Sequence, residues 1–225
     1  MTDLLDLLLD RATVVAPRLL GSVLATTNTA GESVGIRITE VEAYEGVGDP
    51  GSHAYRGMTP RTRPMFGAPP QVYVYLSYGI HSCLNIVCAP EGEGQGCLIR
   101  AGEVVWGEEL MPQRRPKART PRDWARGPGN VGSALGVTVP DSGHALDLQR
   151  LPTGWGSALP GNEDAFELFA PRSRLTLYLP DDRVADANIG RSGRIGVSGP
   201  GGDGEKFPWR FYLRDEKSVS RHPKK

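Results

Sequence analysis

The stretch Tyr73-Val74-Tyr75-Leu76-Ser77-Tyr78-Gly79 places three tyrosines on a short strand that ends at a glycine. The alternation of Val and Tyr predicts a β-strand, Gly79 predicts a turn, and the run His81–Ala89 predicts the returning strand of a hairpin. The first two tyrosines then share one face, and Tyr78 lies near the tip. Tyrosines packed in a core sheet are one interpretation. The other is a tip aromatic presented to a partner such as nucleic acid, whose base stack a side chain can enter.

The length and composition favour one domain of medium size. The chain has 225 residues, of which 39% are hydrophobic, enough for one sizeable core. We expect a single domain over 1–225, with a flexible basic loop at 112–122 and a flexible tail at 216–225. No apolar run reaches the length of a membrane span, and the first ten residues carry three aspartates and no basic residue, unlike a secretory signal. We therefore expect a cytoplasmic protein without membrane contact.

The cysteines and histidines do not form a metal-binding pattern. Cys83, Cys88 and Cys97 lie in apolar strand-like segments and are predicted to be buried and reduced. No CxxC pair occurs, and the four histidines are dispersed along the chain. A zinc site is therefore not favoured, and we expect neither a metal nor a cofactor.

The charges are balanced overall but unevenly distributed. The formal net charge of zero argues against a broad surface that coats nucleic acid. Residues 51–126, however, hold ten basic and six acidic residues, whereas the first fifty hold three basic and eight acidic ones. We interpret Arg56, Arg61 and Arg63 as candidate contacts to nucleic-acid phosphates. The basic cluster within 114–126 is equally consistent with a phosphate footprint and with a solvated loop rich in Pro and Arg.

The hydrophobic pattern along the chain predicts an α+β fold with many irregular connections, in line with 29 glycines and 19 prolines. Three helices are predicted, at Asp3–Leu9, Pro17–Leu20 and Gly127–Gly136. Seven strands are predicted, at Ser22–Thr27, Val34–Tyr44, Val72–Leu76, Ser82–Ala89, Gly96–Val104, Leu175–Leu179 and Trp209–Arg214.

A candidate catalytic pair lies in the second predicted strand. Because side chains alternate across a strand, we expect one face to carry Ile36, Ile38, Glu40, Glu42 and Tyr44. The two carboxylates then lie about 7 Å apart along the strand, and burial raises the pKa of at least one unless an arginine such as Arg100 compensates. A carboxyl group with a raised pKa suits a general acid or base. The alternative is an edge strand with two solvated glutamates.

Seven stretches, in order, closely resemble the alkyladenine DNA glycosylase family, also called 3-methyladenine or methylpurine DNA glycosylases. They are ITEVEAYEG (38–46), SHAYRGMTPRTRPMF (52–66), VYVYLSYGIHSCLNI (72–86), GCLIRAGE (96–103), GPGNV (127–131), GRIGV (193–197) and PWRFYLR (208–214). The match covers nearly the whole chain. It implies one mixed α+β domain with a central, curved, mainly antiparallel β-sheet, short flanking helices and a protruding β-hairpin that enters the DNA minor groove.

The resemblance also implies roles for residues around a base pocket. Glu42 matches the general base that activates water against C1′ of an extruded nucleotide, and Arg100 matches the arginine that helps to hold that water and the carboxylate. The pocket walls match Tyr44, His53 and Tyr75, with Tyr73 as support. Asn85 matches the residue that crowds against the exocyclic amino group of normal guanine.

At the hairpin tip, Tyr78 matches the residue that is inserted into the gap left by the flipped nucleotide, and Ile80 flanks it. Two positions depart from the family pattern. Asn130 stands where a lysine is common, and His81 stands where an aromatic is frequent. These departures leave open how the chain contacts phosphate and how rigid the tip is, and the role of the segment 112–122 is open as well.

The chemistry of N-glycosidic cleavage suits these residue types independently of the family. The reaction passes through an oxocarbenium-like state, for which one carboxylate supplies negative charge and an aligned water. A purine alkylated at N3 or N7 is already cationic, so it leaves without strong acid help and stacks well on aromatic rings. Strand cleavage would need a lysine nucleophile, yet all five lysines lie outside the candidate site segments: Lys117, Lys206, Lys217, Lys224 and Lys225. Simple hydrolysis is expected.

The resemblance therefore implies a monomeric base excision repair glycosylase that binds double-stranded DNA containing damaged purines. It would flip alkylated or deaminated purines out of the duplex, hydrolyse the N-glycosidic bond with a Glu-activated water and leave an abasic site. Expected substrates are 3-methyladenine and 7-methylguanine, with hypoxanthine and ethenoadenine as further candidates. Two alternatives remain open: a glycosidase or nucleosidase that uses Glu40 and Glu42 as an acid–base pair on small substrates, and a non-catalytic binder of damaged nucleic acid.

Overall fold

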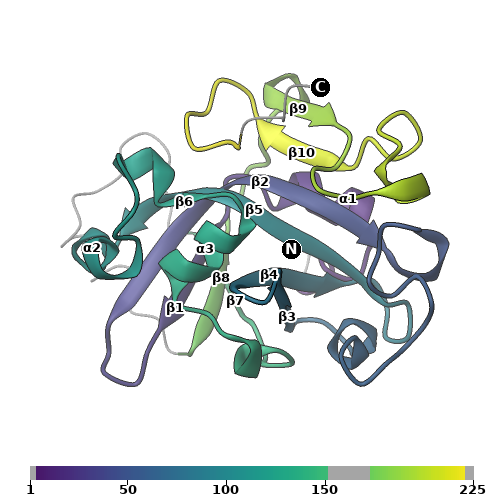
Figure 1. Cartoon of the computed structure of the whole chain (residues 1–225), viewed down its shortest axis with the longest axis horizontal. Helices are drawn as coiled ribbons and strands as arrows, with labels where there is room; N and C mark the ends of the chain where they lie inside the picture. Colours follow the sequence, from purple (N-terminus) through teal and green to yellow (C-terminus); the bar gives the residue numbers. More distant parts are fainter. Residues whose placement is uncertain (1–3, 152–172, 221–225) are drawn as a thin grey trace.

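One curved β-sheet organises the chain (Figure 1). The computed structural model describes residues 4–151 and 173–220. The strands within these ranges are β1 (Val23–Thr27), β2 (Ser33–Glu45), β3 (Val72–Ser77), β4 (His81–Cys88), β5 (Gln95–Trp106), β6 (Ala125–Arg126), β7 (Asp147–Arg150), β8 (Leu175–Leu179), β9 (Ile189–Ser192) and β10 (Arg210–Leu213). The main path of the sheet runs β3-β4-β5-β2-β1-β8-β7. Among the strands of these ranges, only β7 and β8 pair in parallel, so the expected, mainly antiparallel α+β fold is confirmed.

The two longest strands, β2 and β5, form the spine of the sheet and pair along nearly their whole length. Both are almost wholly buried, which means that other elements cover both faces of the spine. Each strand also gains a second partner near the middle of the molecule. β10 pairs with the segment Glu40–Glu42 of β2, and β6 pairs with Ala101 and Gly102 of β5. The acidic segment of β2 is therefore enclosed between β5 and β10.

Short helices pack against this spine. The α-helices of the described ranges are α1 (Ala12–Arg18), α2 (Met111–Arg114) and α3 (Pro128–Leu135). α1 packs on β2 and β5, and α3 packs on β4, β5 and β6 (Figure 1). Within 4–151 and 173–220, no helix combines the length and the apolar character needed to cross a membrane. The helix predicted at Gly127–Gly136 is confirmed as α3.

The two helices predicted at the N-terminus were wrong. Residues 4–9 form turns, Asp3 lies outside the described residues, and the helix begins at Ala12 rather than Pro17. Tertiary hydrogen bonds hold the chain at the junction between these turns and α1. The Leu8 carbonyl accepts from the Ala89 N–H at 2.8 Å, and the Ala12 N–H donates to the Gln95 side chain at 2.9 Å. Both groups are thereby withdrawn from the helical bond that would join residue 8 to residue 12.

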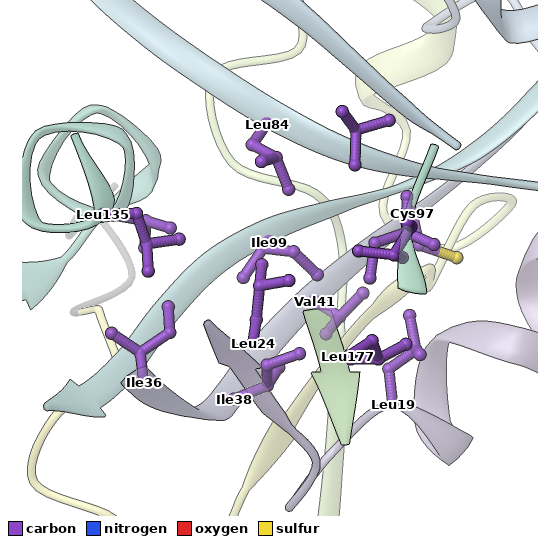
Figure 2. Packing of buried hydrophobic residues seen from close by; sticks show 14 of the residues in the cluster. Leu19, Leu24, Ile36, Ile38, Val41, Leu84, Cys97, Ile99, Leu135 and Leu177 are labelled. Carbon is purple, nitrogen blue, oxygen red and sulfur yellow. The ribbon is translucent and has the colours of Figure 1, made fainter. Parts of the chain in front are cut away.

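The main hydrophobic core combines residues of the sheet with residues of α1 and α3. Figure 2 shows buried side chains from β1, β2, β4, β5, β8 and α3 converging on one region: Leu24, Ile36, Ile38, Val41, Leu84, Cys97, Ile99, Leu135 and Leu177, with Leu19 from the end of α1. Burying one large apolar side chain of this kind contributes about 1.5–3 kcal/mol. The three cysteines are buried free thiols, as predicted. The spine of the sheet is thus held by packing on both sides.

The predicted hairpin is formed by β3 and β4, which pair from Val72 with Ile86 to Ser77 with His81. Helix α3 braces it closely. A Cβ atom on Gly132 would lie 1.9 Å from the Ser82 carbonyl oxygen, so only glycine permits this approach of helix to strand. A Cβ atom on Gly129 would likewise lie 2.7 Å from the His81 ring. The strands of the hairpin are therefore supported by α3 up to the start of the turn.

Candidate active site

A β-bulge in β2 turns the acidic residues away from the core. The pairing with β5 shifts its register between Ile38 and Glu40 and again between Glu40 and Val41. An extra residue inverts the alternation of a strand. The core positions are consequently even-numbered before the bulge and odd-numbered after it: Ile36, Ile38, Val41 and Ala43. We were therefore wrong to expect one shared face for Ile36, Ile38, Glu40, Glu42 and Tyr44.

Arg100 of β5 connects the two carboxylates of β2. Its Nε donates to Oε1 of Glu40 at 3.0 Å, and its Nη1 donates to Oε2 of Glu42 at 3.3 Å. All three side chains are buried. The predicted pairing of Arg100 with one glutamate is confirmed and extended, because the guanidinium contacts both. The alternative of two solvated glutamates is excluded.

Glu40 is enclosed by partners that keep it ionised. Besides Arg100, Nε of Arg210 donates to its Oε1 at 2.6 Å. Ser220 donates through its backbone N–H at 2.7 Å and through its hydroxyl at 2.8 Å. Burial alone would raise the pKa of Glu40, but the charges of the two arginines and these hydrogen bonds hold it below its ordinary value. Glu40 is therefore a counter-ion rather than a proton acceptor.

Glu42 lies in a different environment. It accepts hydrogen bonds from the Tyr44 hydroxyl at 2.8 Å, from the Ile195 N–H at 2.7 Å and from Arg100. Burial nevertheless raises the pKa of Glu42 above its ordinary value, against the single arginine that it shares with Glu40. A carboxylate has about four acceptor positions, and the described residues use three. One position remains for a further donor such as water.

A cavity of about 550 Å³ opens beside Glu42. Glu42 itself does not line it, but its three hydrogen-bonding partners do: Tyr44, Arg100 and Ile195. The carboxylate thus lies next to the cavity, in contact with three of the residues that line it. The volume falls within the range of small-molecule sites, about 300–1,000 Å³.

Aromatic rings form one wall of the cavity. His53 meets Tyr75 edge-on at 4.5 Å between ring centroids, and Tyr75 stacks on Tyr73 at 5.7 Å. Nδ1 of His53 and the Tyr73 hydroxyl share a hydrogen bond of 3.0 Å. Loss of solvent around the ring, together with the charge of Arg61, lowers the pKa of His53 to about 4. Burial raises the pKa of Tyr75. At neutral pH the wall is therefore aromatic and uncharged.

Tyr44 and Asn85 complete the predicted pocket set. The Tyr44 ring lines the cavity and is backed by the Arg194 guanidinium, whose central carbon lies 4.5 Å from the ring centroid. Burial and the neighbouring Glu42 charge raise the pKa of Tyr44 well above its ordinary value, so it stays a hydrogen-bond donor. Asn85 is buried in the lining, and its Nδ2 donates to the Tyr73 carbonyl at 3.1 Å. The structure thus brings together all four predicted pocket residues: Tyr44, His53, Tyr75 and Asn85.

The hairpin tip exposes its two apolar residues. Tyr78 is 90% exposed and Ile80 is 72% exposed. Tyr78 and Gly79 both have positive φ, at 51° and 73°, and the Ile80 N–H closes the turn on the Ser77 carbonyl at 3.1 Å. A left-handed conformation costs a non-glycine residue about 1–2 kcal/mol. The core interpretation therefore holds for Tyr73, which is buried, but not for Tyr78, which is strained, exposed and at the edge of the cavity.

The predicted phosphate contacts lie in the loop that follows His53. Arg56, Arg61 and Arg63 are all exposed, and Arg61 is near enough for its charge to act on His53 and Tyr73. In the basic cluster within 114–126, two arginines already donate to backbone carbonyls of the protein itself. Nη1 of Arg114 donates to the Ala134 carbonyl and Nε of Arg115 to the Trp124 carbonyl. Asn130, which stands where a lysine is common, donates to the Arg126 carbonyl at 2.6 Å.

Sequence reasoning missed the residues that hold this site from a distance. Arg194 and Asp49 form a fully buried ion pair, and Arg210, Ser220 and the Ile195 N–H contact the two glutamates. The stretch GRIGV (193–197) was noted, but it carried no signal for a buried charge. Ser220 belongs to the predicted flexible tail, whose residues 216–220 pack on β2 and whose residues 221–225 lie outside the described part of the chain.

The site offers carboxylate, guanidinium, phenol and imidazole groups around a cavity. Over residues 4–151 and 173–220, no group of three or more His, Cys, Asp or Glu side chains is arranged to hold a metal ion. These groups can accept a proton, orient a water and surround a flat ring. They are suited to acid–base chemistry on a bound aromatic molecule.

Comparison with known proteins gives a consistent result. The family model described as "Methylpurine-DNA glycosylase (MPG)" matches residues 6–217. A Cutibacterium acnes protein is 50% identical over 92% of this chain and 93% of its own length. One from Leifsonia xyli subsp. xyli is 43% identical over 97% of this chain and 92% of its own length. A third, from Streptomyces avermitilis, is 41% identical over 92% and 84%. All three carry the name "Putative 3-methyladenine DNA glycosylase".

Proposed function

Because the chain belongs to the methylpurine-DNA glycosylase family, and is thus a DNA glycosylase of base excision repair, we propose that its cavity receives a damaged purine flipped out of duplex DNA. The observation that carries this proposal is Glu42, a buried carboxyl group with a raised pKa next to an aromatic cavity of about 550 Å³. The substrates are 3-methyladenine and 7-methylguanine, with the neutral lesions hypoxanthine and ethenoadenine as further candidates. The acting unit is a monomer of one domain.

The flipped purine lies between Tyr44 on one side and the His53–Tyr75 wall on the other. An N3- or N7-alkylated purine carries positive charge, which attracts it to the electron-rich faces of these rings. His53 is neutral at pH 7, so it adds a hydrogen bond without repelling a cation. Asn85 is fixed by its bond to the Tyr73 carbonyl and crowds the exocyclic amino group of guanine. Normal guanine is thereby disfavoured, whereas 7-methylguanine is still excised because its positive charge weakens the glycosidic bond.

Glu42 activates the hydrolytic water. The water binds at the free acceptor position of the carboxylate and attacks C1′ as the bond from C1′ to the purine nitrogen breaks. The bonding electrons leave with the purine, and the water proton passes to Glu42. The negative charge of Glu42 stabilises the oxocarbenium-like sugar as it forms. An abasic site and a free base are the products, and the strand stays intact because no lysine lies among the cavity residues.

Arg100 keeps this carboxylate in position without lowering its basicity too far. Its guanidinium is shared between Glu40 and Glu42, so only part of its charge acts on the base. The Tyr44 hydroxyl and the Ile195 N–H fix the carboxylate plane. The remaining acceptor position then faces a defined direction, as an aligned water requires.

Tyr78 enters the duplex at the place that the purine vacates. Its ring is exposed at the edge of the same cavity, and Ile80 flanks it. A side chain that fills the gap offsets part of the few kcal/mol that unstacking costs. Arg56, Arg61 and Arg63 contact the phosphates beside the lesion, so duplex binding weakens as salt increases, with a slope set by a handful of contacts.

Incubation of the protein with alkylated duplex DNA in excess chelator tests this proposal. Free 3-methyladenine or 7-methylguanine should appear, and the strand should stay intact until heat or alkali cleaves the abasic site. Cleavage of free nucleosides with indifference to duplex structure would indicate the nucleosidase alternative. Lesion binding without release of base would indicate the non-catalytic binder. Strand scission by the protein alone, or loss of activity in chelator, would contradict the proposed chemistry.

A further inference from the structure

Arg194 lies at the centre of a buried assembly behind the cavity. Its side chain is fully buried and forms a two-bond ion pair with Asp49, also fully buried, at 2.5 and 2.7 Å. Its Nη1 donates in addition to the Ala43 carbonyl at 3.1 Å, and its Nη2 to the Gly201 carbonyl at 2.8 Å. One guanidinium therefore joins β2, the loop after β2 and the loop after β9.

These segments supply much of the cavity surface. β2 provides Tyr44, the loop after β2 provides 50–53, and the loop after β9 provides 195–198. The contact is close at Gly51, where a Cβ atom would lie 2.4 Å from Nη2 of Arg194. Asp49 in turn accepts from the Gly51 N–H at 2.9 Å. Movement of the guanidinium would thus displace more than one part of the cavity together.

The same guanidinium stands next to both neutral donors of Glu42. It stacks behind the ring of Tyr44, whose hydroxyl donates to Oε2 of Glu42. The residue that follows it in the chain is Ile195, whose N–H donates to Oε1. Phe207 and Trp209 close the cage around it, with ring centroids 5.4 and 5.2 Å from Cζ. Arg194 touches neither the carboxylate nor the cavity.

We infer that Arg194 is a positioning residue for the excision reaction, which fixes Tyr44 and the Ile195 N–H on Glu42 and thereby sets the orientation and basicity of that carboxylate. This inference rests on the proposed function. Arginine is required because its planar fork reaches the Asp49 carboxylate and two carbonyls at once, which the single ammonium of lysine cannot do. Loss of these donors should also make Glu42 harder to ionise, since both lower its pKa.

Several charged or titratable groups bear on Glu42 and must be considered in a pH test. They are Arg100 from β5, Glu40 and Tyr44 from β2, Tyr75 from β3, and Arg194 with Asp49 behind Tyr44, while Arg210 of β10 acts through Glu40. Only Arg194 and Asp49 change in the two test variants below. A shift in the pH dependence of those variants therefore reports on the assembly behind Tyr44.

Two variants test the inference by single-turnover excision of 7-methylguanine from duplex DNA between pH 4 and 9. Arg194→Lys keeps the charge opposite Asp49. The double variant Arg194→Met with Asp49→Asn leaves no buried charge unpaired, so it can fold even where a single neutral replacement cannot. Arg191→Lys is the matched control, because Arg191 also stacks on an aromatic ring, Phe211, but is exposed and outside the cavity lining.

Both test variants should excise about 10- to 100-fold more slowly than wild type while still folded, as expected for small displacements of catalytic groups. In the double variant the acid limb of the rate profile should move to higher pH, and Arg191→Lys should match wild type in rate and profile. Two results would overturn the inference and leave Arg194 a structural residue. One is a folded variant that excises at the wild-type rate. The other is a variant in which fewer molecules are active but the acid limb of the rate profile lies at the same pH as in wild type. A wild type that releases no base would overturn the proposed function, and this inference with it.

Discussion

The two sides of the Arg100 guanidinium show how one strand can hold two glutamates in opposite states. On one side, Glu40 is surrounded by Arg100, Arg210 and Ser220, and its pKa is held below the ordinary value. On the other side, Glu42 shares only Arg100 and lies next to a cavity, where burial raises its pKa. The residue type and the degree of burial are the same. The number of cations and donors around each carboxylate makes the difference.

This contrast assigns different work to the two regions. The Glu40 region joins β2, β5 and β10 to the residues after β10, so its ion pairs stabilise the folded protein. The Glu42 region retains an acceptor position and a higher proton affinity, so we expect it to take part in the reaction. Variants of the two residues should consequently separate stability from excision.

The largest effect is expected for Glu42→Gln, which removes both the proposed general base and its negative charge. Single-turnover excision from alkylated duplex should fall by about three orders of magnitude or more. Lesion binding should persist, since the cavity walls are unchanged. The melting temperature should equal or exceed that of wild type, because a buried carboxyl with a raised pKa costs stability when it ionises at neutral pH. Wild-type turnover in this variant would refute the assignment and point to Glu40.

Glu40→Gln should have the opposite profile, with its main effect on stability. Removing one member of a buried, paired network costs about 3–5 kcal/mol, because Arg210 and Arg100 are left without their shared counter-ion. Chemical denaturation at pH 7 measures this loss. Folding lowers the pKa of Glu40. Its contribution to stability is therefore fully present at a pH above the pKa of the unfolded chain, and it is lost as the pH falls through the pKa of the folded protein. The deficit of the variant should therefore shrink in acid.

Glu103→Gln is the control for Glu40→Gln. Glu103, on β5, likewise pairs with an arginine of the facing strand, Arg37 of β2, but its side chain is 38% exposed. Exposed ion pairs contribute about 0–1 kcal/mol. Equal destabilisation by the two substitutions would show that the Glu40 network holds the fold no more strongly than a surface pair.

A smaller effect is expected at the hairpin tip, away from both glutamates. Tyr78→Ser should slow excision and weaken binding by about tenfold where the lesion is well paired, because the ring no longer offsets part of the cost of unstacking. Mismatched or single-stranded lesions should be affected least. The melting temperature should not fall, since Tyr78 is 90% exposed.

Val47→Ser offers a comparison for the tip variant. Val47 is also an exposed apolar residue, at 59%, and it does not line the cavity. Its replacement should leave excision unchanged for paired and unpaired lesions alike. If Tyr78→Ser unfolds the protein, or slows excision equally in both contexts, the ring is not a wedge.

Local patterns in the sequence located most of the sheet. The strands β1, β2, β3, β4, β5, β8 and β10 occur within two residues of their predicted bounds, because alternating apolar residues and flanking glycines are local signals. The strands β6, β7 and β9 were missed, since each has only two to four residues and depends on a neighbouring strand. The first helix was misplaced, since no local pattern predicts the hydrogen bonds to Ala89 and Gln95 that hold the chain where it begins.

The candidate site was predictable only in part. The resemblance supplied the residues that line the cavity, and the sequence alone supplied the pairing of Arg100 with a glutamate. The β-bulge at Glu40 was invisible, because an inserted residue changes the face of a strand without changing its composition. Arg194, Arg210 and Ser220 meet β2 across more than 140 residues of sequence. No local sequence pattern predicts contacts between residues so far apart in the chain.

The pH dependence of excision tests most directly the claim that Glu42, and not Glu40, is the titrating base. The substrate is duplex DNA with 7-methylguanine, whose fixed positive charge removes any need to protonate the leaving group. The single-turnover rate should rise with pH along one acid limb, with an apparent pKa above the ordinary glutamate value of 4.5. A limb at or below 4.5, or a rate independent of pH through this range, would contradict the account.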